Sequence, residues 1–389
     1  MKSGFLRKFA AACIVAFGFG VVAVMVVLSV GNIDLSASDF IEYWAAEQLI
    51  VHGANPYDPA ATLQLEREAG RQTTLPEVSF SPPVAFAFAL PLGHVSLKTG
   101  FILWRLALLA SLIASIWVLW LVHGCPNTLL HLLCFLFAPT VACLYAGQLG
   151  IFFLLGVALF LYLHKRWPVL GGAALLPCAL KPHLFVPFAA ALILWAIWSK
   201  TYRVLAGFTI ALAISSALTL RLDSQIWSQY TQMVKAMSVM SAVSPTLSAY
   251  FRLVIARNAA WVQFAPEIAA CGWAVWYFWT RRAQWEWNDH GLLVLTVSIL
   301  CRPYGYFMDE SVLLPAVLAS AYRARATGRS LVPLAVFGAA ALIELNQKVQ
   351  VTTAYYLWTS PAWLAWYLYA TRDRRTATEA VDGAASLAG

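Results

Sequence analysis

Long apolar stretches separated by short polar loops run along almost the whole chain. Crossing the hydrocarbon layer of a membrane as a helix takes about 20 apolar residues, and stretches that meet or approach this length recur between residues 9 and 370. By this criterion we expect roughly 10–12 transmembrane helices. The pattern predicts an all-α, polytopic integral membrane protein, with one membrane domain over residues 1–375 and a disordered tail over residues 376–389.

Two stretches, residues 32–80 and roughly 221–262, are too polar or too broken to be simple spans. If the N-terminus is inside, the first of them lies on the outer face, and we expect the second there too. Within the first stretch, Gly53 and Pro56 end a short helix over residues 39–52, and a second amphipathic helix ends at Gly70. The apolar residues of the first helix predict that it lies on the membrane surface, so this outer loop is expected to carry interfacial helices.

Strict alternation of spans fails after this loop. Four apolar pieces follow it, at about 82–95, 100–122, 127–146 and 148–164. The next basic pair, residues 165–166, lies inside only if the chain crosses the membrane an odd number of times after the loop. We therefore expect the piece around 127–146 to be re-entrant or broken. Broken membrane segments occur where their backbone lines a polar cavity, which makes "YAGQLG", residues 145–150, a candidate cavity.

The composition excludes an ordinary soluble enzyme. Hydrophobic residues make up 61% of the 389 residues and charged residues only 11%, whereas soluble domains are about one quarter charged. The net charge of +8 arises from Lys and Arg that cluster in short loops, as in residues 165–166 and 281–282. This positive-inside bias predicts that both termini lie in the cytoplasm, and it indicates no nucleic-acid partner. We expect the protein in the inner (plasma) membrane.

Asp39 is the first candidate for chemistry. It could simply cap the helix that follows, with Glu42 completing a capping box. A carboxylate held at a membrane face beside aromatic residues also has what a general base needs, because partial burial raises its pKa. Tyr43, four residues along the helix, shares its face.

The outer loop contains "DFIEYWAAEQLIVHGANPYD", and three segments follow it: "FSPPVAFAFALPLG", "GQLGIFFLLGVALFLYLHKRWPVLGGAALLPCALKPHLFVPF" and "RPYGYFMDESVLLPAVL". In this order they resemble the signature of glycosyltransferase family 87, mannosyltransferase-like proteins of the GT-C superfamily. The resemblance covers most of the chain and implies a GT-C fold. It also implies an inverting transfer of a sugar, mannose by default, from a polyprenyl-phosphate donor to a hydroxyl of a glycolipid or glycan acceptor. This reaction would serve cell-envelope biosynthesis on the periplasmic or extracellular side.

The resemblance implies roles for single residues. Asp39 matches the family's catalytic base, and Tyr43, Asn55 and Tyr57 in the same signature segment are expected to contact substrate. The donor phosphate needs a fixed positive charge. The candidates for this charge are Lys181, Arg302 and Arg252, in that order. The remaining candidate substrate contacts are Gln148, His183, Tyr304 and Asp309.

Some of these residues could instead serve the fold alone. Lys181 could snorkel to water from a helix break, and Gln148 could merely satisfy broken backbone. Asp309 lies within an apolar segment and needs a partner, which could be Arg302 or Lys348.

The chain also departs from the family pattern. Gly150 stands where Asn is common, Arg302 replaces Ser, and Tyr304 stands where His is frequent. Arg302 could compensate for the missing His, because a guanidinium binds phosphate through two parallel hydrogen bonds.

We expect no metal and no cofactor. The cysteines show no metal-ligand spacing, and the chain has neither a D-x-D pair nor a Gly-rich phosphate loop. A secondary transporter or lipid flippase is the main alternative, because it would also explain the spans and the intramembrane charges. Transporters usually show internal repeats, and we detect none. A catalytically silent scaffold is the other alternative.

Overall fold

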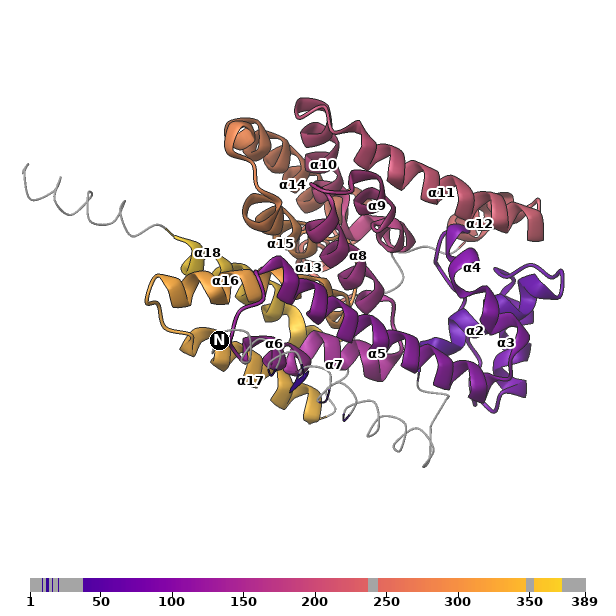
Figure 1. Cartoon of the computed structure of the whole chain (residues 1–389). Helices are drawn as coiled ribbons and strands as arrows, with labels where there is room; N and C mark the ends of the chain where they lie inside the picture. Colours follow the sequence, from indigo (N-terminus) through magenta and orange to yellow (C-terminus); the bar gives the residue numbers. More distant parts are fainter. Residues whose placement is uncertain are drawn as a thin grey trace, which may run out of the picture.

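The computed structural model describes residues 38–236, 244–347 and 353–372, with a few isolated positions before residue 38. Throughout these ranges the regular elements are helices, and no strand occurs in them (Figure 1). The expected all-α class of a helical membrane protein is confirmed. The expected disordered tail and most of the first apolar segment lie outside the described residues.

Among the described residues, two helices are long and apolar enough to cross a membrane by themselves, α5 (Leu97–Val122) and α11 (Tyr202–Leu222). The Ser96 hydroxyl caps the start of α5 by accepting from the Thr99 amide, and Gly124 follows its end with a φ of 74°. At 1.5 Å per residue the 26 residues of α5 span about 39 Å. The expected number of crossings stays a prediction, because most other apolar helices are shorter.

The other α-helices described after residue 122 are α6 (Leu130–Leu133), α7 (Ala138–Ala146), α8 (Gly150–Leu163), α9 (Pro168–Ala173), α10 (Val186–Trp198), α12 (Ile226–Ala236), α13 (Leu247–Ile255), α14 (Ala260–Arg281), α15 (Leu292–Leu300), α16 (Leu314–Ala326), α17 (Val332–Asn346) and α18 (Thr359–Thr371). Short 3-10 helices join several of them, among them η2 (Leu90–His94), η3 (Cys134–Leu136), η4 (Leu176–Leu180), η5 (Pro182–Leu184) and η8 (Phe307–Leu313).

The predicted break around residues 127–146 is confirmed. This stretch forms α6, η3 and α7 in succession, with Pro139 in the first turn of α7, where its missing N–H costs no hydrogen bond. The left-handed Gly147, with a φ of 78°, then ends α7 before α8 begins. Whether the segment re-enters the membrane stays a prediction.

The outer loop forms α2 (Phe40–Val51), α3 (Pro59–Glu68) and α4 (Val84–Ala89), close to the expected boundaries. Gly53 and Gly70 follow α2 and α3 with positive φ, as their places in the sequence predict. The apolar residues of α2 do not form an outward-facing stripe: the helix is buried on most sides by protein. Helices that are apolar all round pack inside a protein rather than on a surface, so the predicted surface position does not describe α2.

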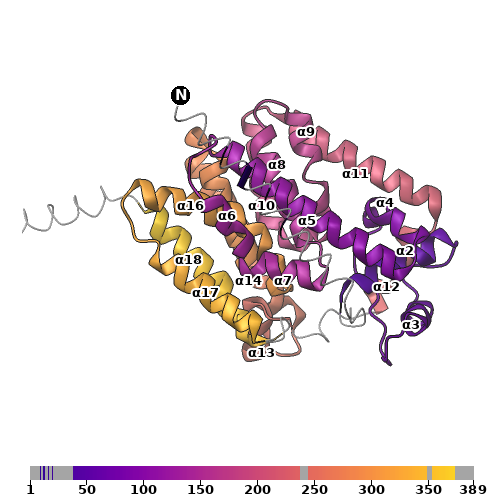
Figure 2. The ribbon, with the colours of Figure 1, turned by 60° about the horizontal axis from the view of Figure 1, so that its bottom comes forward.

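The outer-loop helices gather at one end of the molecule together with α12, in both views (Figures 1 and 2). A separate hydrophobic cluster joins them there, made of Ala46, Ile50, Tyr57, Val78, Phe86, Ile226 and Met233. The Ser215 hydroxyl of α11 also donates to the Val84 carbonyl at 2.7 Å. The first polar stretch and the α12 part of the second therefore lie on the same side of the molecule.

Basic loops gather around the other end of α5. His123, just after α5, lies with its ring 4.7 Å from that of Tyr322, beside Arg323, which pairs with Asp289 at 2.7 Å. Nearby in the sequence, Glu286 pairs with Lys165 at 2.7 Å. The start of α5, in contrast, packs under α2, since the Trp44 indole donates to the Val95 carbonyl at 3.0 Å. The length of α5 thus separates the basic loops from the outer-loop helices.

Candidate functional site

Asp39 stands directly before α2 but does not cap it. No cap hydrogen bond involves its side chain, whose Oδ2 instead accepts from Gln148 Nε2 at 2.6 Å. The Ser38 hydroxyl accepts from the Phe40 amide at 3.3 Å and donates to the Ala146 carbonyl at 2.9 Å, which joins the start of α2 to the end of α7. Asp39 is therefore not a helix cap, and its carboxylate is turned toward the α7–α8 junction.

Gln148 lies in that junction and is only 4% exposed. Other groups satisfy the broken backbone around it: the Trp104 indole donates to the Gly147 carbonyl at 2.7 Å, and the Cys143 thiol donates to the Gln148 carbonyl at 3.0 Å. A Cβ on Gly147 would lie 3.1 Å from Phe40 Cβ and from Ser38 Oγ. The glycine thus allows α2 to approach closely, and the Gln148 amide is left for contacts between side chains.

The orientation of this amide follows from its partners. Its Oε1 accepts from the Tyr43 hydroxyl at 2.8 Å and from Lys181 Nζ at 3.1 Å. An ammonium group can only donate, so the amide oxygen must face Lys181 and the NH2 group must face Asp39. Gln148 therefore joins the expected base to the expected cation through a single side chain.

Lys181 separates η4 from η5, at the break that Pro182 makes. Its Nζ lies 2.8 Å from Asp309 Oδ1, and its side chain is 17% exposed. Lys181 Nζ thus contacts the polar side chains of Asp309 and Gln148 within the protein, so it does not snorkel to water. Asp309 is fully buried, and its Oδ2 accepts from the Tyr306 amide at 2.8 Å. The ion-pair partner of Asp309 is thus Lys181, not Arg302 as the sequence suggested; Lys348 lies outside the described residues.

Arg302 belongs to a second network behind this pair. It is 2% exposed, and its Nη2 lies 3.1 Å from Glu310 Oε1. Its Nη1 donates to the Ser360 hydroxyl at 3.0 Å. Gly305, with a φ of 148°, lies between the networks: a Cβ there would lie 2.8 Å from Arg302 Nε and 3.0 Å from Asp309 Oδ2. These contacts favour a structural role for Arg302 over the compensating phosphate contact.

His183 and Tyr304 come from different signature segments, and their rings lie side by side. His183 follows Lys181 by two residues in the sequence. Their ring centroids are 3.8 Å apart with planes tilted by 31°, and both residues are half-buried. The Tyr that stands in the place of His thus packs its ring against that of His183.

Three expected substrate contacts form hydrogen bonds elsewhere. Asn55 Oδ1 accepts from the Tyr57 amide at 2.9 Å, and the buried Tyr57 hydroxyl donates to the Ser81 carbonyl at 2.9 Å. Arg252 Nε donates to Gln263 Oε1 at 2.7 Å. These bonds shape the turn before α3 and the segment around α13. Their expected contacts with substrate stay predictions.

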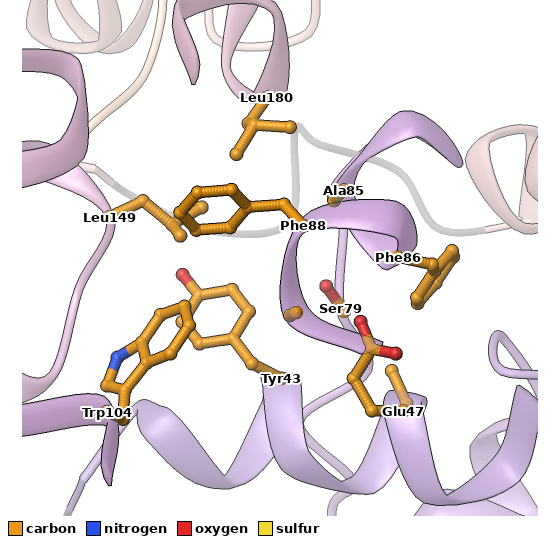
Figure 3. Close-up of a pocket in the computed structure, with 11 residues that line it drawn as sticks. Tyr43, Glu47, Ser79, Ala85, Phe86, Phe88, Trp104, Leu149 and Leu180 are labelled. Carbon is orange, nitrogen blue, oxygen red and sulfur yellow. The ribbon is translucent and has the colours of Figure 1, made fainter. Parts of the chain in front are cut away.

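The sequence predicts no individual role in the site for two acidic residues of α2, Glu42 and Glu47. Burial, followed by the charge of Asp39, raises the pKa of half-buried Glu42 to about 8. Burial also raises the pKa of Asp39 above its ordinary value, against the hydrogen bond from Gln148 and the charge of Lys181. The sequence suggests Glu42 as a capping partner of Asp39, and its spacing of three residues places it on the same helix face. The second residue, Glu47, lines a small pocket together with Tyr43 and Trp104 (Figure 3).

Over the described ranges, no three His, Cys, Asp or Glu side chains come together as a metal site would need. The requirement for a metal stays untested. What the site offers is a half-buried carboxylate and an ammonium group that are held on opposite ends of one amide.

The family model described as Glycosyltransferase family 87 matches residues 80–303. The match spans more than half of the chain and includes Gln148, Lys181 and Arg302, whereas Asp39 lies before it. No curated protein and no solved structure matches the chain.

Proposed function

Because the chain belongs to glycosyltransferase family 87 and is thus a glycosyltransferase, we propose that it transfers mannose from polyprenyl phosphate to an acceptor hydroxyl. The acceptor is a glycolipid or glycan, and transfer inverts the anomeric configuration. The observation that carries this proposal is the Asp39–Gln148–Lys181 arrangement. Family membership favours this enzyme over the transporter and scaffold alternatives.

In the proposed reaction, the Asp39 carboxylate takes the proton of the acceptor hydroxyl as its oxygen attacks the anomeric carbon. The bond from that carbon to the phosphate oxygen breaks, and polyprenyl phosphate leaves with the bonding electrons. The Lys181 ammonium group stabilises the charge on the leaving phosphate. Direct displacement needs the base and the leaving group on opposite sides of the carbon. Gln148, which lies between Asp39 and Lys181, supports such an arrangement.

Asp309 has a positioning role in this proposal. It anchors the Lys181 ammonium at 2.8 Å while Gln148 accepts a second hydrogen bond from it. An ammonium group has three donors, which leaves one for a phosphate oxygen. The Asp309 charge also stabilises the ammonium in a buried position, where an uncompensated charge is expensive.

The membrane placement is supported by the two ends of α5. Asp39 and the outer-loop helices lie at its start, and the basic loops lie around its end. Because basic loops stay in the cytoplasm, we place the site on the outer face of the inner membrane, with both termini inside. A polyprenyl-linked donor in the bilayer can reach such a site directly.

The proposal is tested by donor choice and product stereochemistry. Purified protein in detergent is incubated with a crude membrane-lipid acceptor fraction and [14C]mannose carried either on polyprenyl phosphate or on a nucleoside diphosphate. We expect label to enter lipid or glycan from the polyprenyl donor alone, in the opposite anomeric configuration to the donor. Transfer from the nucleotide donor, or retention of configuration, would contradict the proposal.

A further inference from the structure

Asp39, Tyr43 and Glu47 are spaced four residues apart and therefore share one face of α2. The rise of a helix places the first and last about 12 Å apart along the axis. Tyr43 lies between them and donates to Gln148 at 2.8 Å. One helix face thus continues from the proposed base, past the central amide, to a second carboxyl group.

Glu47 is 2% exposed, and its Oε2 has no hydrogen-bond partner. A buried polar group without a partner costs stability, so each such group calls for an explanation, such as a bound water or a ligand. Burial raises the pKa of Glu47 well above its ordinary value, which favours a neutral carboxyl group. Such a group can both donate and accept a hydrogen bond.

The Glu47 side chain lines a small pocket beside the site (Figure 3). Its wall includes Leu149 and Leu180, which are the sequence neighbours of Gln148 and Lys181. The free volume is about 10 Å³, close to what one water molecule needs. The pocket therefore adjoins the proposed reaction centre and has room for one hydroxyl-sized group.

The remaining wall of the pocket consists of four aromatic residues, three alanines and one serine. Phe88 and Trp104 pack edge to face, with ring centroids 6.4 Å apart, and Ser79 adds a hydroxyl. An isoprenoid chain would suit the rings but would leave the Glu47 carboxyl without a partner. A single ligand hydroxyl fits the free volume and satisfies the carboxyl, and the C–H groups that flank a hydroxyl of a sugar suit the neighbouring rings.

We propose that Glu47 binds a hydroxyl group of a sugar substrate and orients that sugar for the reaction at Asp39. This inference rests on the proposed function, because it assumes a sugar ligand. The hydroxyl belongs either to the transferred sugar or to the acceptor, and its chemistry is the same in both cases.

The test measures sugar binding rather than transfer, so it is independent of the donor. Methyl α-D-mannopyranoside is the probe, and saturation-transfer NMR on the full chain in detergent reports its affinity. Glu47→Met removes the hydrogen-bonding group, whereas Glu47→Gln keeps one donor and one acceptor. Glu68→Met, at an exposed position of α3, is the surface control. Thermal unfolding shows whether each variant is folded.

We expect Glu47→Met to weaken binding about tenfold, the effect of losing one buried hydrogen bond, while Glu47→Gln and Glu68→Met bind like wild type. The melting temperature of Glu47→Met should not fall, because an apolar group replaces an unpaired buried one. Equal binding by wild type and Glu47→Met would overturn the inference. So would no binding by wild type, or a lower melting temperature of Glu47→Met with unchanged binding.

Transfer kinetics then assign the source of the hydroxyl. A raised KM for polyprenyl-phosphate mannose in Glu47→Met identifies the donor sugar, and a raised KM for the acceptor fraction identifies the acceptor. Unchanged values of both would overturn the inference. Absence of transfer by wild type would count against the proposed function alone, because the binding measurement does not depend on it.

Discussion

Asp39 accepts a 2.6 Å hydrogen bond from Gln148, a residue 109 positions away in the sequence. The same amide accepts from Lys181 on its other side. The hydrogen bond from Gln148 connects the first outer loop to the α7–α8 junction at the proposed base, Asp39. Gln148 is therefore a positioning residue in this proposal: its NH2 group must face Asp39 and its Oε1 must face Lys181.

Replacing the Gln148 amide, which donates a hydrogen bond to Asp39, by a carboxylate should impair Asp39 as a base. Gln148→Glu places a second carboxylate against Asp39, and two like charges in contact raise the pKa of one of them. We expect kcat to fall about 10- to 100-fold at pH 7, as expected when a general base is partly protonated. The pH–rate profile should shift to higher pH. Gln64→Glu, on the exposed face of α3, is the matched control and should leave the profile unchanged.

Lys181 should contribute to stability and to catalysis in separable ways. Lys181→Met leaves Asp309 buried without its partner, which should destabilise the fold by about 3–5 kcal/mol. In the double variant Lys181→Met/Asp309→Asn the unpaired charge is gone, so much of the stability should return. Transfer activity should remain low, because no cation faces the leaving phosphate. Chemical denaturation and transfer assays on the same samples measure both effects. Recovery of full activity in the double variant would exclude the proposed role of Lys181.

The turn that holds Asp309 should not tolerate a side chain at Gly305. Gly305→Ala forces a residue with a Cβ to a φ of 148° and places that Cβ 2.8 Å from Arg302 Nε. We expect a loss of about 1–3 kcal/mol in unfolding free energy. Gly338→Ala is the control, since a Cβ there meets nothing within 4 Å. A stable Gly305→Ala protein would show that the two networks are less rigid than their contacts imply.

Glu42 gives the protein a pH-dependent stability. Its pKa of about 8 in the folded protein exceeds the ordinary value of 4.5, so the folded state binds the proton more tightly than the unfolded state between these values. Stability should therefore be highest below about pH 4.5 for this group and fall as the pH rises toward 8. Glu42→Gln should flatten this decline. Melting temperatures of both proteins between pH 5 and 8 measure it, and parallel curves would contradict the assignment.

The sequence predicted the helical class, the short helices of the outer loop and the break before Gln148, because glycines, prolines and apolar periods are local signals. Asp39 and Lys181 were recognised from motifs. Their connection could not be predicted, because it depends on contacts across more than 100 residues. The sequence offered Arg302 or Lys348 as an ion-pair partner of Asp309 and did not suggest Lys181, which lies 128 positions away. No individual role was predicted for Glu47, because only packing shows that this carboxyl group is buried beside the site.

The central claim is that Asp39 is the base, and Asp39→Asn tests it most directly. Asp58→Asn is the matched control: the same change in the same loop, at a residue that caps α3 by accepting from the Ala60 amide at 2.8 Å, a role that Asn also fills. Each purified protein is incubated with polyprenyl-phosphate-[14C]mannose and the acceptor fraction. We predict that transfer falls at least about 100-fold in Asp39→Asn and stays near wild type in Asp58→Asn, with both proteins folded. Wild-type transfer by a folded Asp39→Asn protein would contradict the account.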